Sequence, residues 1–385
     1  MSTLIALPRI LRIGADALAD LPAVLADMGC RRPLIVTDDY LVSTGAVTRI
    51  GEGLRAAGIE FAVFGDVVPD PTTDSLKPAA DLVRTEGCDA VIGFGGGSSM
   101  DTAKAVALLA TTDRPMREFK APTLTDEPLL PIIAIPTTAG SGSEATRFTV
   151  ITDSETGEKM LCPGMAFLPT AAIVDHTLTS SMPPRLTADT GIDALTHAVE
   201  AYVSRKANPF SDSFALTAIS TIGRYLRRAF ADGADDQARE HMMLAATQAG
   251  IAFSNSSVAL VHGMSRPLGA HFHISHGMSN AMLFPAVTEF SVGAATARYA
   301  DCARAYGVAD DDHSDEAAAA LFVAELRQLN HDLEVPAPHD LSIDPDQWAG
   351  LLPTMAEQAL ASGSPQNNPV VPTADEIAAI YRSIF

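Results

Sequence analysis

The first half of the chain alternates short apolar runs with longer amphipathic stretches. The apolar runs are PLIVT (33–37), EFAVFG (60–65), AVIGF (90–94), IIAIP (132–136) and AAIVD (171–175). Runs of this kind, separated by helical stretches, are typical of a parallel sheet with helices on both faces. We therefore predict an α/β N-terminal domain with a parallel, Rossmann-like sheet.

The pattern changes from about Leu186 onward. Alanine-rich amphipathic segments such as 211–230 and 315–330 follow one another without β-branched runs, which predicts an all-helical C-terminal domain. Met182-Pro183-Pro184 interrupts the two patterns, so the domains are predicted to be 1–183 and 184–385. Near the end, 365–372 is predicted to be a loop, and Thr373-x-x-Glu376 a capping box that starts a final helix.

Two segments of the second half, Gly191–Ser204 and Val261–Pro285, are predicted to be helix-like and carry four potential metal ligands. Residues four apart lie on one helix face, so Asp193 and His197 can bind one cation together. The second segment supplies His262 and His276. Three imidazoles and one carboxylate suit a borderline ion such as iron or zinc, rather than calcium or magnesium.

The alternative for the first pair is a polar contact at the surface. Its neighbours Ala194, Leu195, Ala198 and Val199 are too apolar for a solvated face. A buried aspartate must find a cation or several donors. The four residues together therefore favour a metal site.

A glycine cluster follows the predicted strand 90–94, in the stretch AVIGFGGGSSMDTAK. A helix is predicted after the glycines, with Asp101 near its start. Glycines allow backbone amides to approach a phosphate closely, and a helix N-terminus favours the anion. The dinucleotide motif GxGxxG is not met, since Ser98 stands where the last glycine would be. A purely structural turn remains the alternative.

Polar residues also follow two other predicted strands. Asp38, after strand 33–37, could bond the ribose hydroxyls of NAD and repel the 2′-phosphate of NADP, although Asp38 and Asp39 could instead cap a helix. The loop after strand 132–136 offers hydroxyls that could bind a ligand or their own turn: Thr137, Thr138 and Ser141.

Four stretches, GGGSSMDTAK, PTTAGSGSEAT, MPPRLTADTGIDALTHAVEAY and HGMSRPLGAHFHISHGMSNAMLFP, occur in this order. Together they resemble the iron-containing (group III) alcohol dehydrogenase family, that of lactaldehyde reductase and 1,3-propanediol dehydrogenase. The resemblance runs nearly end to end. It implies a dehydroquinate synthase-like fold, with a dinucleotide-binding domain followed by a helical metal-binding and substrate domain. It also implies that NAD is the cofactor and that Fe²⁺, or alternatively Zn²⁺, is the metal.

The resemblance assigns roles to individual residues. It places the metal, and with it catalysis, on Asp193, His197, His262 and His276. Nucleotide contacts fall on Asp38, Gly96, Gly97, Ser98, Thr137, Thr138, Ser141, Thr146, Lys159 and Leu186. Many relatives have Asn where this chain has Asp70, which leaves that contact open. Phe148, Phe253 and Arg266 are candidates for the substrate pocket.

Arg266 departs from the family pattern, because many members have a histidine at this position. A guanidinium cannot pass a proton as an imidazole can. Arg266 could bind an anionic group of the substrate, or pair with a nearby acid and cover apolar surface. His271 and His273 could replace the missing histidine, or lie as surface residues on a turn before His276.

Composition limits the partners. A net charge of −21 argues against nucleic acid and anionic membranes, and no apolar run is long enough to span a bilayer. The four cysteines, Cys30, Cys88, Cys162 and Cys302, lack paired spacing, and the first residues lack a signal-peptide pattern. A cytoplasmic protein acting on small molecules is expected, and the resemblance implies a homo-oligomer, a dimer.

The expected function is that of an NAD-dependent alcohol dehydrogenase or aldehyde reductase acting on a small alcohol, diol or hydroxy acid. Its metal would act as a Lewis acid on the alcohol oxygen while hydride passes to the nicotinamide. One alternative is a reductase of an acidic semialdehyde or oxo acid, similar to 4-hydroxybutyrate dehydrogenase or maleylacetate reductase. Another is a non-catalytic scaffold subunit that retains the fold.

Overall fold

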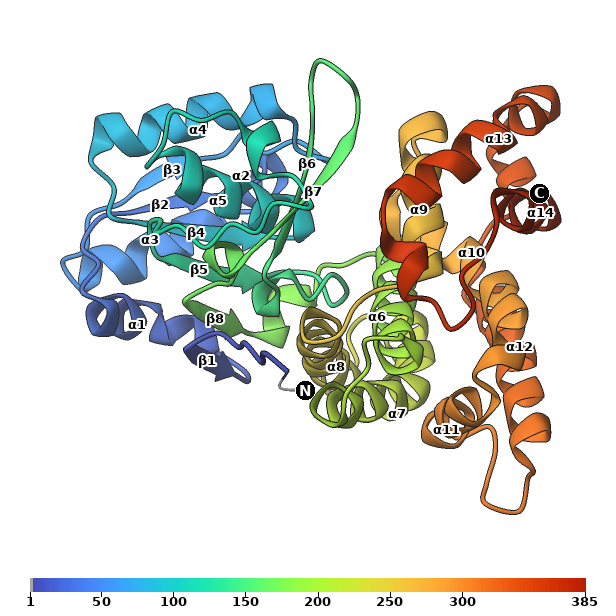
Figure 1. Ribbon diagram of the computed structural model, residues 1–385. Coiled ribbons are helices and arrows are strands. Elements are labelled where there is room, and N and C mark those ends of the chain that lie inside the picture. Colours follow the sequence, from blue (N-terminus) through green and yellow to red (C-terminus); the bar gives the residue numbers. More distant parts are fainter. Residues whose placement is uncertain (1–2) are drawn as a thin grey trace. The chain divides into compact units, whose positions relative to one another are not determined.

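The computed structural model describes residues 3–385 and divides into two compact units, Ile5–Ser180 and Ser181–Phe385, the second of which also includes Thr3 and Leu4 (Figure 1). The first unit contains a six-stranded parallel sheet in the order β1-β8-β5-β4-β2-β3. Its strands are β1 (Ile10–Ile13), β2 (Pro33–Val36), β3 (Ala62–Phe64), β4 (Ala90–Gly95), β5 (Ile132–Pro136) and β8 (Ala171–Val174). The five predicted strands are confirmed, while β1 was not predicted.

Alternation along the strands builds a core on each face of this sheet. On one face, Leu34 and Val36 pack with α4 (Thr73–Glu86) and α5 (Gly97–Leu109). On the other, Ile35 packs with α1 (Leu21–Met28) and α3 (Ala46–Ala56) (Figure 1). Because both faces are covered, every residue of β2, β4 and β5 is buried, which explains their uninterrupted apolar sequences.

Smaller elements complete the α/β unit. A two-stranded antiparallel sheet pairs β6 (Phe148–Thr152) with β7 (Lys159–Pro163), and α2 (Asp39–Ser43) follows β2. Short 3₁₀ segments are η1 (Ala17–Asp20), η2 (Met116–Phe119), η3 (Ser143–Ala145), η4 (Met165–Phe167) and η5 (His176–Thr179).

The second unit is helical, as predicted. Its helices are α6 (Pro184–Val203), α7 (Pro209–Ala231), α8 (Asp236–Ser254), α9 (Leu260–Phe272), α10 (His276–Ser291), α11 (Thr296–Tyr306), α12 (Asp315–Asp332), α13 (Pro345–Ala361) and α14 (Ala374–Ser383). The short segments are η6 (Val292–Ala294), η7 (Pro338–Leu341) and η8 (Ser364–Asn367), the last within the predicted loop. The capping box of Thr373 and Glu376 is confirmed at the start of α14.

The prediction of one helix-like segment over Val261–Pro285 was wrong. His273 adopts a left-handed conformation (φ 55°) and ends α9, and α10 begins at His276. The next residue, Gly277, lies against α6, where an added Cβ would stand 2.5 Å from the carbonyl oxygen of Asp189. A glycine is therefore needed for the start of α10 to approach α6.

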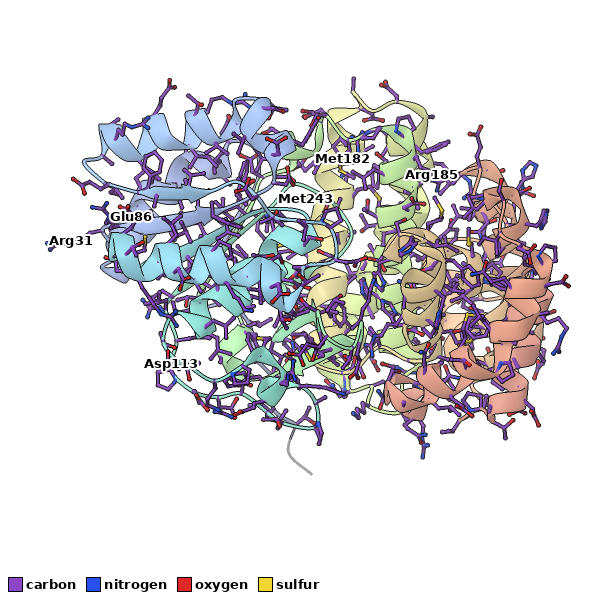
Figure 2. All side chains as sticks on the ribbon, turned by 90° about the horizontal axis from the view of Figure 1, so that it is seen from above. Arg31, Glu86, Asp113, Met182, Arg185 and Met243 are labelled. Carbon is purple, nitrogen blue, oxygen red and sulfur yellow. The ribbon has the colours of Figure 1, made fainter. Side chains whose placement is uncertain are left out.

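The first predicted segment begins earlier than expected, because Pro184 supplies a preorganised first turn for α6. Arg185, labelled in Figure 2, donates from Nη1 to the carbonyls of Leu333 and Glu334, both at 2.9 Å, and so joins α6 to the end of α12. Among residues 3–385, no helix is long and apolar enough to cross a membrane.

Candidate metal centre and phosphate-binding turn

The helical unit brings the four predicted metal ligands together. One potential ligand atom from each of Asp193, His197, His262 and His276 lies within 4.8 Å of the other three. Asp193 Oδ1 is common to three short distances, 3.8 Å to His197 Nδ1, 3.6 Å to His262 Nε2 and 3.7 Å to His276 Nε2. The ligands come from three helices, α6, α9 and α10.

These distances fit four ligands around one shared ion better than direct hydrogen bonds between Asp193 and the histidines. At 3.6–3.8 Å the ring nitrogens are too far from the carboxylate to hydrogen-bond. Two ligands of a tetrahedral ion are roughly 3.4 Å apart when the metal bonds are about 2.1 Å. Asp193, His197 and His262 are buried, and the His276 side chain is 45% exposed. The donor set and its spacing therefore fit a divalent iron or zinc ion.

The electrostatics of the cluster favour positive charge. Burial alone would raise the pKa of Asp193, but His197, His276 and His262 hold it below its ordinary value. Burial would lower the pKa of His262, yet Glu200 and Asp193 raise it to about 9. A buried carboxylate that remains ionised among three imidazoles is a suitable ligand for a cation.

Glu200 is a functional residue that the sequence analysis missed. Its Oε2 lies 2.6 Å from His262 Nδ1, and its carboxylate accepts the backbone N–H groups of Ala259 at 2.8 Å and Val261 at 2.6 Å. Because Nδ1 of His262 is bonded to Glu200, it is Nε2 that faces the cluster. Glu200 thus orients His262 and also caps the start of α9.

Asn280 is a second missed residue. It lies one turn after His276 on α10 and is fully buried. Its Nδ2 donates to Asp193 Oδ1 at 2.6 Å and lies 3.3 Å from His262 Nε2 and 3.2 Å from His276 Nε2. Its Oδ1 has no hydrogen-bond partner among the described residues. Asn280 therefore fixes the orientation of the Asp193 carboxylate within the cluster.

Glu200→Gln is expected to weaken metal binding by about 10- to 100-fold, the range typical for partners of metal-bound histidines. Glutamine keeps the side-chain length but replaces the carboxylate that bonds three donors. The dissociation constant of the metal can be measured by competition with a chelator. Glu357→Gln, an exposed position on α13, is the matched control. Unchanged affinity in Glu200→Gln would refute the orienting role.

In the α/β unit, the glycine cluster joins β4 to α5 as predicted. Gly95 has φ 148°, and an added Cβ would collide with the Ser99 hydroxyl, so only glycine fits. Gly96 is the N-cap of α5 and offers no side chain to cap it. The first N–H groups of α5, on Gly97, Ser98 and Ser99, therefore have no partner within the helix and suit an anion.

The loop after β5 lies against this turn. Thr137 N–H donates to the Gly95 carbonyl at 3.0 Å. The Thr138 side chain faces Gly96, and the Ser141 side chain faces Gly97, both within 4 Å of where a Cβ would stand. The structure thus brings together the glycines and hydroxyls predicted to contact the nucleotide.

The buried Lys104 holds the segment that continues this loop, from Ser143 to Phe148, by hydrogen bonds. Lys104 Nζ donates to the Ser143 carbonyl (2.8 Å) and hydroxyl (2.9 Å), to the Thr146 carbonyl (3.0 Å) and hydroxyl (3.1 Å), and to the Phe148 carbonyl (2.8 Å). Burial lowers the pKa of Lys104 to about 8, against the opposing effect of Asp101. The Thr146 hydroxyl, predicted to contact the nucleotide, is buried in this network.

The remaining predicted nucleotide residues are placed as follows. Asp38 Oδ1 accepts the Leu41 N–H at 2.9 Å, so Asp38, rather than Asp39, is the N-cap of α2. Lys159 Nζ pairs with Asp70 Oδ1 at 2.9 Å, which gives Asp70 a partner in this chain. Leu186 belongs to α6 in the other unit and is 37% exposed.

The candidate substrate residues divide between the units. Phe253, on α8, stacks on the His197 ring with centroids 4.3 Å apart, so it lines the metal cluster. Phe148 begins β6 in the α/β unit. His271 bonds Gln358 Oε1 at 2.8 Å, and His273 is an exposed residue of the turn after α9. Neither histidine belongs to the metal cluster.

A parallel α/β unit with an anion-binding glycine turn, followed by a helical unit with an Asp-His₃ cluster, defines a metal-dependent dehydrogenase with a dehydroquinate synthase-like fold. Two family models match the chain, iron-containing alcohol dehydrogenase over residues 8–176 and the C-terminal part of the same family over residues 187–385. The chain belongs to the iron-containing alcohol dehydrogenase family.

Individual relatives agree with this membership. The chain is 37% identical to the NAD-dependent methanol dehydrogenase of Bacillus methanolicus, covering 96% of this chain and 97% of that protein. It is 36% identical to lactaldehyde reductase of Escherichia coli (strain K12), covering 97% of each. A crystal structure of 1,3-propanediol oxidoreductase superposes with a TM-score of 0.96 and 37% identity over the whole of both chains.

Proposed function

We propose that this protein is an NAD(H)-dependent, iron-containing alcohol dehydrogenase or aldehyde reductase for small alcohols, diols or hydroxy acids. The observation that carries the proposal is the convergence of one carboxylate and three imidazoles within 4.8 Å. The family membership and the NAD-dependent relative support the choice of cofactor.

In this proposal the helical unit holds the metal and the substrate, and the α/β unit holds the nucleotide. Asp193, His197, His262 and His276 would bind the ion, Glu200 orients His262 so that Nε2 faces the ion, and Asn280 holds Asp193. An ion bound there would supply Lewis acidity to an alcohol or carbonyl oxygen. Phe253 closes one side of the cluster, where its ring excludes water from the reacting atoms.

The nucleotide is proposed to bind the turn at the start of α5. The N–H groups of Gly97 and Ser98, together with the hydroxyls of Thr138 and Ser141, would hold its pyrophosphate. The other proposed contacts are Asp38, Gly96, Thr137, Thr146, Lys159 and Leu186. Thr146 would contribute through the shape of its loop, because its hydroxyl is bonded to Lys104.

The direct test is reconstitution. The protein is purified free of metal, Fe²⁺ or Zn²⁺ is added, and NADH oxidation is followed with a panel of small aldehydes. Metal-dependent turnover is expected, and the comparison shows which ion supports the higher activity. NADH binding without turnover under any of these conditions would instead favour a non-catalytic scaffold.

Asp38→Asn is expected to narrow the preference for NAD over NADP. Asparagine caps a helix as well as aspartate, so α2 keeps its start while the charge that repels a 2′-phosphate is removed. We expect the ratio of kcat/KM with NAD to kcat/KM with NADP to fall by roughly tenfold in this variant, which corresponds to ~1.4 kcal/mol. Asp39→Asn is the control. Equal use of both cofactors by the unmodified enzyme would contradict the role of Asp38.

We further propose a cytoplasmic homodimer. The four cysteines, Cys30, Cys88, Cys162 and Cys302, are all free and buried, which supports a reducing compartment. The family resemblance supports the oligomer, and light scattering of the metal-loaded protein would measure its mass.

A further inference from the structure

Arg266 is on α9, the helix that also supplies the metal ligand His262. It follows His262 by four residues on α9, so the two side chains occupy one face. Long side chains on a helix lean toward its N-terminus, and the electrostatic effect of Glu200, the partner of His262, on Arg266 agrees with this direction. The Arg266 side chain is partly buried.

The charge of Arg266 is not matched by the protein. Within residues 3–385, its guanidinium makes no hydrogen bond and has no carboxylate oxygen within 4.0 Å. The other arginines of the helical unit pair with a carboxylate, as Arg298 does with Asp212 at 2.7 Å, or are exposed, as Arg205 and Arg224 are. The buried Arg239 has no carboxylate partner but donates hydrogen bonds to neutral oxygens of Gly233, Thr187 and Met182. Arg266 combines partial burial with the lack of a partner.

Glu200 is the acidic residue whose charge acts on the Arg266 guanidinium. Its carboxylate already accepts hydrogen bonds from the Ala259 and Val261 N–H groups and contacts His262 Nδ1. Burial lowers the pKa of the Arg266 guanidinium, which still remains charged at neutral pH. The two negative charges of Asp193 and Glu200 would balance the two positive charges of a divalent ion. The positive charge of Arg266 would then have no counter-charge. A partly desolvated guanidinium that has no hydrogen-bond partner is stabilised by an anion, which offsets the cost of its burial.

We propose that this anion is part of the substrate, so that the enzyme prefers short aldehydes or alcohols bearing a carboxylate or sulfonate. The planar fork of Arg266 can bind two oxygens of such a group at once. The metal cluster beside it would hold the reacting oxygen at the other end of the molecule. This inference rests on the proposed dehydrogenase function and names the substrate class for it.

The test compares two aldehydes of equal chain length, succinic semialdehyde and butanal. The wild-type enzyme is expected to have the higher kcat/KM for succinic semialdehyde. In Arg266→Met the ratio of the two kcat/KM values should fall by about 10- to 100-fold, the value of a charge-assisted hydrogen bond. Arg266→Lys should retain part of the preference, because it keeps the charge but loses the fork.

Binding supplies an independent readout. Succinate, which cannot react, should raise the Tm of the wild-type protein more than butyramide does, and this difference should vanish in Arg266→Met. Arg327→Met is the matched control, since Arg327 is an exposed residue of α12 paired with Glu289. It should leave both the kinetic ratio and the succinate effect unchanged.

The outcomes separate the two proposals. If no aldehyde is reduced, the proposed function fails. If butanal is reduced at least as efficiently as succinic semialdehyde by the wild type, only the role of Arg266 is overturned, whatever the variants do. If folded Arg266→Met has the wild-type ratio of kcat/KM for succinic semialdehyde to kcat/KM for butanal, the role of Arg266 is likewise overturned.

Discussion

His262→Ala is expected to abolish metal retention and to lower turnover by at least about 1,000-fold. The ring supplies one of four ligands, and a Lewis acid contributes several kcal/mol, of which each ~1.4 kcal/mol is a factor of ten in rate. Its loss also leaves the Glu200 carboxylate without the partner at 2.6 Å. We expect a lower free energy of unfolding for the helical unit as a second consequence.

His276→Ala should give the same loss of metal with a smaller loss of stability. The His276 side chain is 45% exposed, so its removal leaves no comparable buried charge. His271→Ala is the control, because His271 is on the same helix as His262, α9, but bonds Gln358 outside the cluster. It should retain both metal and turnover.

Bound metal is measured by elemental analysis, and NADH binding by fluorescence. Both ligand variants should still bind NADH, because the phosphate-binding turn lies in the α/β unit. Full metal occupancy in both variants would refute the ligand assignment. Loss of NADH binding in both would show that the defect is not confined to the metal.

Lys104→Met is expected to destabilise the α/β unit by about 3–5 kcal/mol, because it leaves several buried hydrogen-bond acceptors unsatisfied at about 1–3 kcal/mol each. Lys104 is fully buried, and its ammonium donates to oxygens of three residues between Ser143 and Phe148. Methionine fills the volume but leaves these oxygens without their donor and removes the positive charge that acts on Asp101. The loop that flanks the phosphate-binding turn should loosen, so the affinity for NADH should fall as well.

Chemical denaturation monitored by circular dichroism measures the change, with bound NADH titrated separately. Lys77→Met is the control, since Lys77 is an exposed residue of α4 paired with Asp74. It should unfold at the wild-type denaturant concentration. A midpoint for Lys104→Met equal to that of the control would show that the five hydrogen bonds of Lys104 contribute nothing to stability.

The parallel sheet was predictable because its central strands are apolar on both faces, a pattern that few other elements share. β1 escaped prediction because Arg12 interrupts an edge strand that is half exposed. The hairpin of β6 and β7 was not predicted, because the polar residues Thr149, Thr152 and Lys159 interrupt the apolar pattern of its strands. The break after Phe272 escaped because nothing in the sequence requires His273 to take a positive φ.

The four metal ligands were predictable because their spacing and chemistry are specific. Glu200 and Asn280 were not, although both repeat the helical spacing of the ligands, at three residues after His197 and four after His276. Their roles depend on atoms distant in sequence, such as the Ala259 N–H, 59 residues after Glu200, and Asp193 Oδ1, 87 residues before Asn280. Only the packing of α6, α9 and α10 brings these atoms into contact.

The metal ligands, with Glu200, Asn280 and Arg266, all belong to the unit Ser181–Phe385, while the glycine turn and Lys104 belong to Ile5–Ser180. Each unit also has its own buried interior. Recombination between relatives at Ser180–Ser181 would therefore exchange a complete metal cluster or a complete phosphate-binding turn, and never half of one. Chimeras joined at this bond should inherit their preference for NAD or NADP from the parent that supplies Asp38, and their metal preference from the parent that supplies the cluster.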